Sequence, residues 1–220
     1  MSTLISITLD NDIVPQLLDI ASGLCYLHSL HIAHGDMKGP NVLISEARRA
    51  LITDFGFSRL TNPPPSLQVD PPCGGSLPWM APERLNTPTP SSTQADVWAF
   101  GMTVLELFSR KNPFHEVRTK WGVMSRIVEG RLPDRPSDES TSFRLCDSWW
   151  NICLECWEYD PVQRPAMNDI VARVEKLNEG TGRADGGKGE GTGGEGGGRR
   201  LWLRVQQLGY LLFQRGRDRR

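Results

Sequence analysis

Four polar side chains that lie close together in the sequence have the types needed for chemistry on phosphate groups. They are Asp36, Lys38, Asn41 and Asp54. Magnesium prefers carboxylate and amide oxygens as ligands, and a lysine ammonium group can pair with a phosphate oxygen. Each of these residue types is common by itself, so the spacing between them has to carry the identification.

The spacing of these residues matches a known pattern. Asn41 lies five residues after Asp36, and Asp54 lies eighteen after it and opens the triplet Asp54-Phe55-Gly56. Further along, the chain has Met-Ala-Pro-Glu at 80–83, Asp-Val-Trp-Ala-Phe-Gly at 96–101, and a late Arg164. Together these segments resemble the catalytic loop, metal-binding triplet and later motifs of the eukaryotic protein kinases. The resemblance covers about residues 12 to 178 and is confined to the C-terminal lobe of the kinase fold.

The resemblance implies roles for the four polar residues. Asp36 would accept a hydrogen bond from the substrate hydroxyl, and Lys38 would reach the transferring phosphate, so both are the expected catalytic residues. Asn41 and Asp54 would bind magnesium, and with Lys38 they would hold the cofactor, Mg²⁺-ATP. The implied substrate is a protein.

Two details favour the tyrosine-kinase-like (TKL) group with serine/threonine specificity. Lysine two residues after the aspartate is typical of serine/threonine kinases. Ser76, seven residues before Glu83, occupies the position of a family threonine that contacts the aspartate and the lysine.

The catalytic loop departs from the family pattern at one position. Gly35 replaces the arginine that normally precedes the aspartate and pairs with a phosphorylated activation loop. We therefore expect that phosphorylation of Ser58, Thr61 or Ser66 does not switch this protein by the common route.

Other motif residues are expected to be scaffold. Glu83 and Arg164 should form a buried ion pair, Asp96 should brace the catalytic-loop backbone, and His34 and Phe55 should pack internally. The remaining histidines of the sequence, His28, His31 and His115, show no partner pattern.

The hydrophobic pattern predicts an α+β fold that is predominantly helical. A helix is expected from about residue 13 to 31 with Asp12 as its N-cap and Pro15 in its first turn. Short apolar runs at 42–44 and 50–52 predict a hairpin that brings Asn41 and Asp54 together. The proline-rich stretch 57–80 should be a mobile surface loop. The segment 94–108 is apolar nearly all round and should be a buried helix. Further helices are expected around 121–129, 145–156 and 166–178.

Composition separates four parts of the chain. A short lead (1–11) precedes the kinase lobe (12–178), which is followed by a glycine-rich flexible linker (179–198) and a basic amphipathic tail (199–220). The tail is either a contact for an anionic membrane or a partner groove, or an unselected extension. The net charge of -1 does not suggest nucleic-acid binding. The five cysteines are odd in number and sparse, which indicates reduced thiols in a cytoplasmic or nuclear protein. The lone pair Cys153 and Cys156 is expected to pack in the core.

The sequence before the first helix contains neither a glycine-rich phosphate loop nor a strand lysine. We therefore expect the N-terminal lobe to be absent, the inter-lobe face to be exposed and prone to self-association, and the chain alone to be weakly active or inactive. The alternative is a non-catalytic, pseudokinase-like scaffold that docks partners through its helical surface and its tail.

Overall fold

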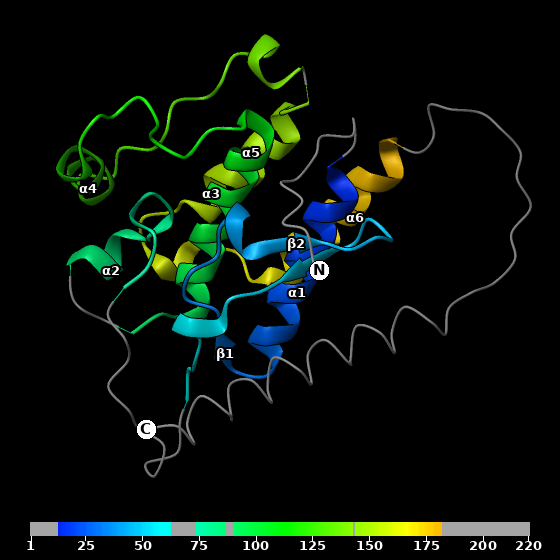
Figure 1. Cartoon of the computed structure of the whole chain (residues 1–220), viewed down its shortest axis with the longest axis horizontal. Helices are drawn as coiled ribbons and strands as arrows, with labels where there is room; N and C mark the ends of the chain where they lie inside the picture. The colour runs from blue at the N-terminus through cyan, green and yellow to red at the C-terminus, as the bar shows by residue number, and fades with distance from the viewer. Residues whose placement is uncertain (1–12, 63–73, 87–89, 143, 182–220) are drawn as a thin grey trace, which may run out of the picture. The chain divides into compact units, whose positions relative to one another are not determined.

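The computed structural model describes residues 13–62, 74–86, 90–142 and 144–181, and its fold is mainly helical (Figure 1). Its α-helices are α1 (Val14–Ser29), α2 (Pro82–Asn86), α3 (Thr93–Ser109), α4 (Lys120–Val128), α5 (Asp147–Cys156) and α6 (Met167–Thr181). Its strands are β1 (Ile32–Ala33), β2 (Val42–Ile44), β3 (Ala50–Ile52) and β4 (Arg59–Leu60). β1 pairs antiparallel with β4, and β2 pairs antiparallel with β3 in the register Leu43 to Leu51.

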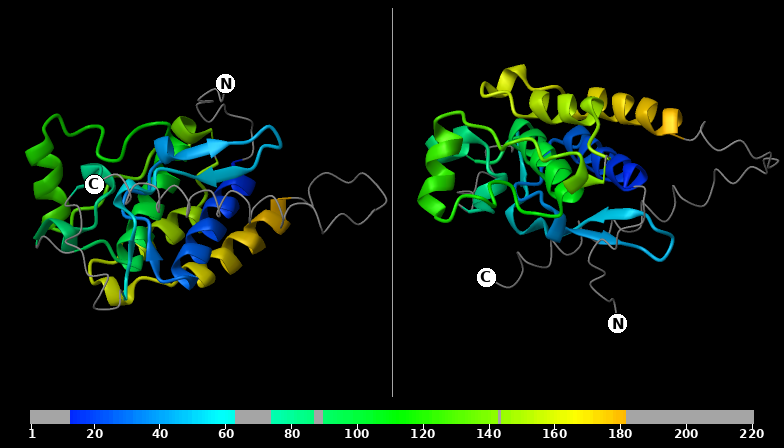
Figure 2. Two further views of the ribbon diagram at one scale, coloured as in Figure 1. Left: turned by 60° about the horizontal axis from the view of Figure 1, so that its bottom comes forward. Right: turned by 90° about the horizontal axis from the view of Figure 1, so that it is seen from above.

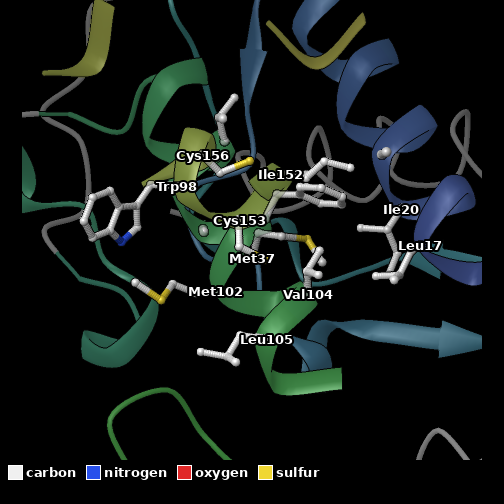
Figure 3. Close-up of a cluster of buried hydrophobic side chains, with 14 of the residues drawn as sticks. Leu17, Ile20, Met37, Trp98, Met102, Val104, Leu105, Ile152, Cys153 and Cys156 are labelled. Atoms are coloured by element: carbon white, nitrogen blue, oxygen red, sulfur yellow. The ribbon is translucent and has the colours of Figure 1, made fainter. Parts of the chain in front are cut away.

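Helix α3 is the centre of the hydrophobic core. Ser92 caps its start, because the Ser92 hydroxyl accepts a 3.1 Å hydrogen bond from Ala95 N. Its apolar side chains are buried on nearly every face, as the sequence predicted. Helices α1 and α5 both pack against it. In Figure 3, Trp98, Met102, Val104 and Leu105 of α3 lie among residues of α1, α5 and the loop 34–41, which is called the catalytic loop after the motif that it resembles.

The β2–β3 hairpin is fixed to α1 by a buried carboxylate. Asp19 of α1 accepts hydrogen bonds from the Arg49 guanidinium at 2.6 to 2.9 Å and from Ala50 N at 2.9 Å. In both views of Figure 2, α1 lies between this hairpin and α6. Because the hairpin cannot shift along α1, the residues at its open end, next to Asn41 and Thr53, keep a fixed position.

The sequence predicted most of these elements. The strands at 42–44 and 50–52 and the buried helix are confirmed, and α4, α5 and α6 match the expected helical segments within a few residues. The first helix begins at Val14, follows Ile13 as its N-cap, and has Pro15 in its first turn as expected. The expectation of Asp12 as the N-cap is therefore wrong, and Asp12 itself lies outside the described residues.

The expectation of a plain loop over 57–80 is wrong in part. Residues Arg59–Leu60 form β4, and Leu77–Trp79 form a short 3₁₀ helix. The prolines of this stretch that suggested a loop lie mostly outside the described residues, and so does Ser66. A two-residue strand is too short to produce the alternation from which a strand is predicted.

The C-terminal region is described only at its start. The chain divides into the units Met1–Glu179 and Gly180–Arg220. The first residues of the expected linker, up to Thr181, continue α6. The rest of the linker and the tail at 199–220 lie outside the described residues. Within the described ranges, no helix has both the length and the apolar character to cross a bilayer.

Glu83 and Arg164 form the expected ion pair. The two guanidinium nitrogens Nη1 and Nη2 of Arg164 each donate a 2.8 Å hydrogen bond to one carboxylate oxygen of Glu83. The Arg164 side chain is 0% exposed, and its guanidinium carbon lies 5.1 Å from the centre of the Trp98 ring. This pair therefore ties α2 to the buried face of α3.

Replacing Arg164 by methionine should lower the free energy of unfolding by about 3 to 5 kcal/mol, because it removes a buried guanidinium that donates to the Glu83 carboxylate and to the carbonyls of Glu158 and Gln94. Urea denaturation measures this loss. The control is Arg126→Met, which breaks the exposed pair of Arg126 with Glu116 and should cost about 1 kcal/mol or less. Equal losses in the two variants would contradict the buried role of Arg164.

Candidate active site

The catalytic loop is anchored to α3 by the carboxylate of Asp96, which is 1% exposed. His34 N donates to Asp96 Oδ2 at 2.7 Å, and Gly35 N donates to Asp96 Oδ1 at 2.9 Å. This confirms the expected brace. His28 Nε2 also contacts Asp96 Oδ2 at 3.0 Å, a partner that the sequence did not reveal. A buried carboxylate with several hydrogen bonds is a rigid anchor, since releasing any donor would leave a buried polar group unsatisfied.

Two buried side chains hold the loop from its inner side. Met37 is 0% exposed and points into the core (Figure 3). His34 is also 0% exposed. Its ring packs edge-on against the Phe55 ring, with the two ring centres 5.3 Å apart, and its Nε2 lies 3.0 Å from Thr53 O. The internal packing expected for His34 and Phe55 is therefore confirmed. Because Met37 points inward, the neighbouring Asp36 and Lys38 side chains are free to face the opposite side of the loop.

The Asp36 carboxylate is the point where the predicted residues meet. Asp36 Oδ1 accepts from Ser76 N at 2.8 Å, and Asp36 Oδ2 accepts from Lys38 Nζ at 2.8 Å. Lys38 Nζ also donates to the Ser76 hydroxyl at 2.6 Å. The contact of Ser76 with both the aspartate and the lysine is the one that the sequence predicted.

These contacts set the charge state of Asp36. Burial acts to raise the pKa of Asp36, but the hydrogen bonds from Lys38 and Ser76 and the Lys38 charge outweigh it and lower the pKa below its usual value. Asp36 is therefore a carboxylate at neutral pH, ready to accept a hydrogen bond from a hydroxyl group.

Asn41 is joined to Asp36 through its amide nitrogen. Asn41 Nδ2 donates to Asp36 O at 2.7 Å and to Asp36 Oδ2 at 3.3 Å. Since Nδ2 is committed to Asp36, Oδ1 is the atom of this amide that suits a metal ion. Asn41 O accepts from Thr53 N at 2.9 Å, and Thr53 directly precedes Asp54. The hairpin thus brings Asn41 and Asp54 to the same end, as predicted.

Asp54 is exposed and has a strained backbone. Its φ is 59°, in the left-handed region, which aspartate tolerates better than most residues. Its Oδ1 accepts from Gly56 N at 3.3 Å. Asp54 and Asn41 offer hard oxygens at one end of the hairpin, which fits magnesium bound to a nucleotide, because that ion takes its other ligands from phosphates and water. A protein-only cluster of three or more metal-binding side chains is not found among the described residues.

Glu106 of α3 is a site residue that the sequence analysis missed. Its Oε2 accepts from Gly39 N at 2.8 Å and from Trp79 Nε1 at 2.9 Å, so it connects the catalytic loop to the 3₁₀ helix after Ser76. Burial raises the pKa of Glu106, partly offset by these hydrogen bonds. A Cβ at position 39 would lie 2.7 Å from Glu106 Oε1, so glycine allows this close approach.

The cysteine pair of α5 lies in the core. Cys153 and Cys156 are each 0% exposed, and burial raises the pKa of both thiols well above the usual value. A buried neutral thiol suits packing and is a poor metal ligand. Their positions agree with the packing interpretation.

Comparison with known proteins identifies the family. Residues 7–174 match the family described as protein tyrosine and serine/threonine kinase, which is most of the chain. The chain belongs to the protein kinase family. The chemistry of that family is phosphoryl transfer to protein hydroxyls.

Several curated kinases are similar to this chain. It is 35% identical over 170 residues to the probable serine/threonine-protein kinase pats1 of Dictyostelium discoideum, covering 74% of this chain and 5% of that protein. It is 33% identical over 160 residues to the RGS domain-containing serine/threonine-protein kinase A of the same organism, covering 73% and 13%. It is 31% identical over 172 residues to mitogen-activated protein kinase kinase kinase 13-B of Xenopus laevis, covering 74% and 16%. The chain thus spans a small part of the length of these relatives.

Replacing Lys38 by methionine should raise the pKa of Asp36, because burial then acts without its main opposing contact. Carbon-13 NMR titration of the Asp36 carboxyl measures this pKa. The wild-type pKa lies below its unfolded value, so ionised Asp36 stabilises the fold above the ordinary carboxyl range of about 4. That stabilisation is lost as the pH falls through the folded pKa.

The matched control is Lys111→Met, which removes an exposed lysine and should leave the Asp36 titration unchanged. An Asp36 pKa that is the same in the Lys38→Met variant and in the wild type would show that Lys38 does not set the charge state of Asp36.

Proposed function

We propose that this domain transfers the terminal phosphoryl group of Mg²⁺-ATP to serine or threonine hydroxyls of a protein substrate. The observation that carries the proposal is the Asp36 carboxylate, which is held by Lys38, Ser76 and Asn41 at once. Two oxygen ligands, from Asn41 and Asp54, lie at the adjacent end of the hairpin. Magnesium bound to the triphosphate would neutralise the charge that develops on the phosphate oxygens.

Asp36 acts mainly by orienting the acceptor. Because its pKa is lowered, it is a weak base, and its contribution is to accept a hydrogen bond from the hydroxyl and fix its direction. The proton can pass to Asp36 late, when the hydroxyl oxygen is already bonded to phosphorus. Ser76 N holds Oδ1 in place throughout.

Lys38 supplies a cation beside the base. Its side chain is 20% exposed, so Nζ can contact a phosphate oxygen while remaining close to Asp36. Lys38 donates a hydrogen bond to the Ser76 hydroxyl, and the relatives include serine/threonine kinases. Both observations support serine/threonine specificity and the TKL assignment.

The elements described here correspond, in this proposal, to the C-terminal lobe of a kinase. A polypeptide of these 220 residues would transfer phosphate slowly, because its sequence offers no glycine-rich strand turn and no strand lysine to cover the triphosphate. Water reaching the open site would weaken the charge stabilisation on which the reaction depends. Leu43 and Leu51, which are half-buried register partners on the hairpin, offer apolar surface for a second lobe, a nucleoside base or another copy of the chain.

A scaffold function is the second candidate. Trp121 of α4 is 80% exposed, and large aromatic side chains are often contact residues in protein interfaces. A partner bound there would need Trp121 and would tolerate Asp36→Asn, whereas phosphoryl transfer requires Asp36.

Nucleotide binding and phosphoryl transfer should be tested on the same protein. Manganese-ATP should broaden the NMR signals of the Asn41 side-chain amide and of the Asp54 amide, because the paramagnetic ion replaces magnesium there. Asp54→Ala should abolish the broadening, and Asp134→Ala, which removes an exposed carboxylate elsewhere, should not. Transfer of labelled phosphate to a generic protein should be slow and should fall at least about tenfold in Asp36→Asn.

Broadening centred on other residues, or transfer that is equal in Asp36→Asn and wild type, would overturn the proposal. Rapid transfer by these 220 residues alone, abolished by Asp36→Asn, would support the chemistry and refute the expected weakness.

A further inference from the structure

Arg84 connects the catalytic loop to the segment that precedes Ser76. It lies on α2 and follows Glu83 directly. Its Nη1 donates to Gly35 O at 2.8 Å, and its Nη2 donates to Gly74 O at 2.8 Å. One planar guanidinium therefore bridges the backbones of two segments that are far apart in the sequence.

The conformation of Gly35 explains why the arginine that bridges these two segments is at position 84 and not at position 35. Gly35 has φ +85°, and a Cβ there would lie only 2.5 Å from Phe57 O. A side chain at position 35 would have to displace the Phe57 backbone. In this structure no arginine fits at position 35, whereas Arg84 reaches the Gly35 carbonyl from outside the loop.

Side chains satisfy every polar backbone group of His34 and Gly35. The two N–H groups donate to Asp96, the His34 carbonyl accepts from the Ser58 hydroxyl at 3.0 Å, and the Gly35 carbonyl accepts from Arg84. The segment that runs from Ser58 to Ser76 is thus attached to the catalytic loop near both of its ends.

The position of Arg84 is itself fixed. Its neighbour Glu83 forms the partly buried pair with Arg164, so α2 cannot move away from Arg164 without breaking two hydrogen bonds of 2.8 Å. Two residues beyond Gly74, Ser76 N makes the hydrogen bond to Asp36. A chain of contacts therefore runs from Arg164 through Glu83 and Arg84 to the carboxylate of Asp36.

We propose that Arg84 is a positioning residue that holds the segment 74–76 on the catalytic loop without phosphorylation, and so maintains the Ser76–Asp36 contact. The importance of that contact for catalysis rests on the proposed function. The contact itself can be measured without nucleotide, so a failure of this proposal is distinguishable from a failure of the proposed function.

The test is the ¹H–¹⁵N spectrum and amide hydrogen exchange of the full 220-residue chain carrying Arg84→Gln. Loss of the bridge should shift the amide signals of Asp36 and Gly75, which follow the two acceptor carbonyls. Exchange of Ser76 N should become at least tenfold faster, while the amides of α3, α5 and α6 keep their rates. The control is Arg126→Gln, which removes a half-buried arginine of α4 that does not contact the site and should change none of these signals.

Two further variants keep the proposal falsifiable. Arg84→Lys retains the charge but reaches one carbonyl at a time, so Ser76 N should exchange at a rate between those of wild type and Arg84→Gln; this variant decides the matter if Arg84→Gln does not fold. Thr61→Glu, which mimics phosphorylation, should leave Ser76 exchange unchanged.

The proposal is overturned if Ser76 N exchanges at the wild-type rate in both Arg84 variants. It is also overturned if exchange rises equally in all helices, because Arg84 would then be a general scaffold residue. A marked slowing of Ser76 exchange in Thr61→Glu would show that phosphorylation, rather than Arg84, fixes the segment.

Discussion

The arrangement of the site depends on the buried carboxylate of Asp96. It accepts hydrogen bonds from the backbone N–H groups of His34 and Gly35 and contacts His28. A carboxylate with 1% exposure is stable only when its oxygens are well satisfied. The loop donors supply that satisfaction, so α3 and the catalytic loop constrain each other. Asp36 is the next residue in the chain, so the hydrogen bonds of His34 and Gly35 also fix its position.

The rest of the site is built on this anchor by one contact within the loop, from Asn41, and by contacts of Ser76 and Glu106 from remote parts of the sequence. Ser76 approaches Asp36 from one side, and Asn41 approaches it from the other. Glu106 joins Gly39 to Trp79, which places the segment after Ser76 beside the loop. The result is a preorganised carboxylate with a cation next to it. Preorganisation of this kind is what phosphoryl transfer needs from a protein, since the reaction requires positioning and charge stabilisation more than covalent help.

The sequence predicts the local features well and the distant pairings poorly. The strands at 42–44 and 50–52 and the buried helix α3 follow from short-range hydrophobic patterns. The contacts of Ser76 and the pair of Glu83 with Arg164 follow from motif spacing. His28 and Arg84 were missed because their partners, Asp96 and Gly35, are far along the chain and have no fixed spacing to them. The role of Arg84 also depends on the left-handed backbone of Gly35, which residue type alone does not reveal.

The most direct test of this account is the amide hydrogen exchange of His34 and Gly35 in wild type and in Asp96→Asn. Asparagine has nearly the size of aspartate, but its amide NH₂ group replaces one oxygen. That NH₂ group would face a backbone N–H of the loop, and two donors cannot form a hydrogen bond. In wild type both amides should exchange only with global unfolding, as the core amides of α3 do. In Asp96→Asn they should exchange at least tenfold faster than those of α3. If the amides of His34 and Gly35 exchange at the same rate as the core amides of α3 in Asp96→Asn as well as in wild type, the claim that Asp96 fixes the loop is contradicted.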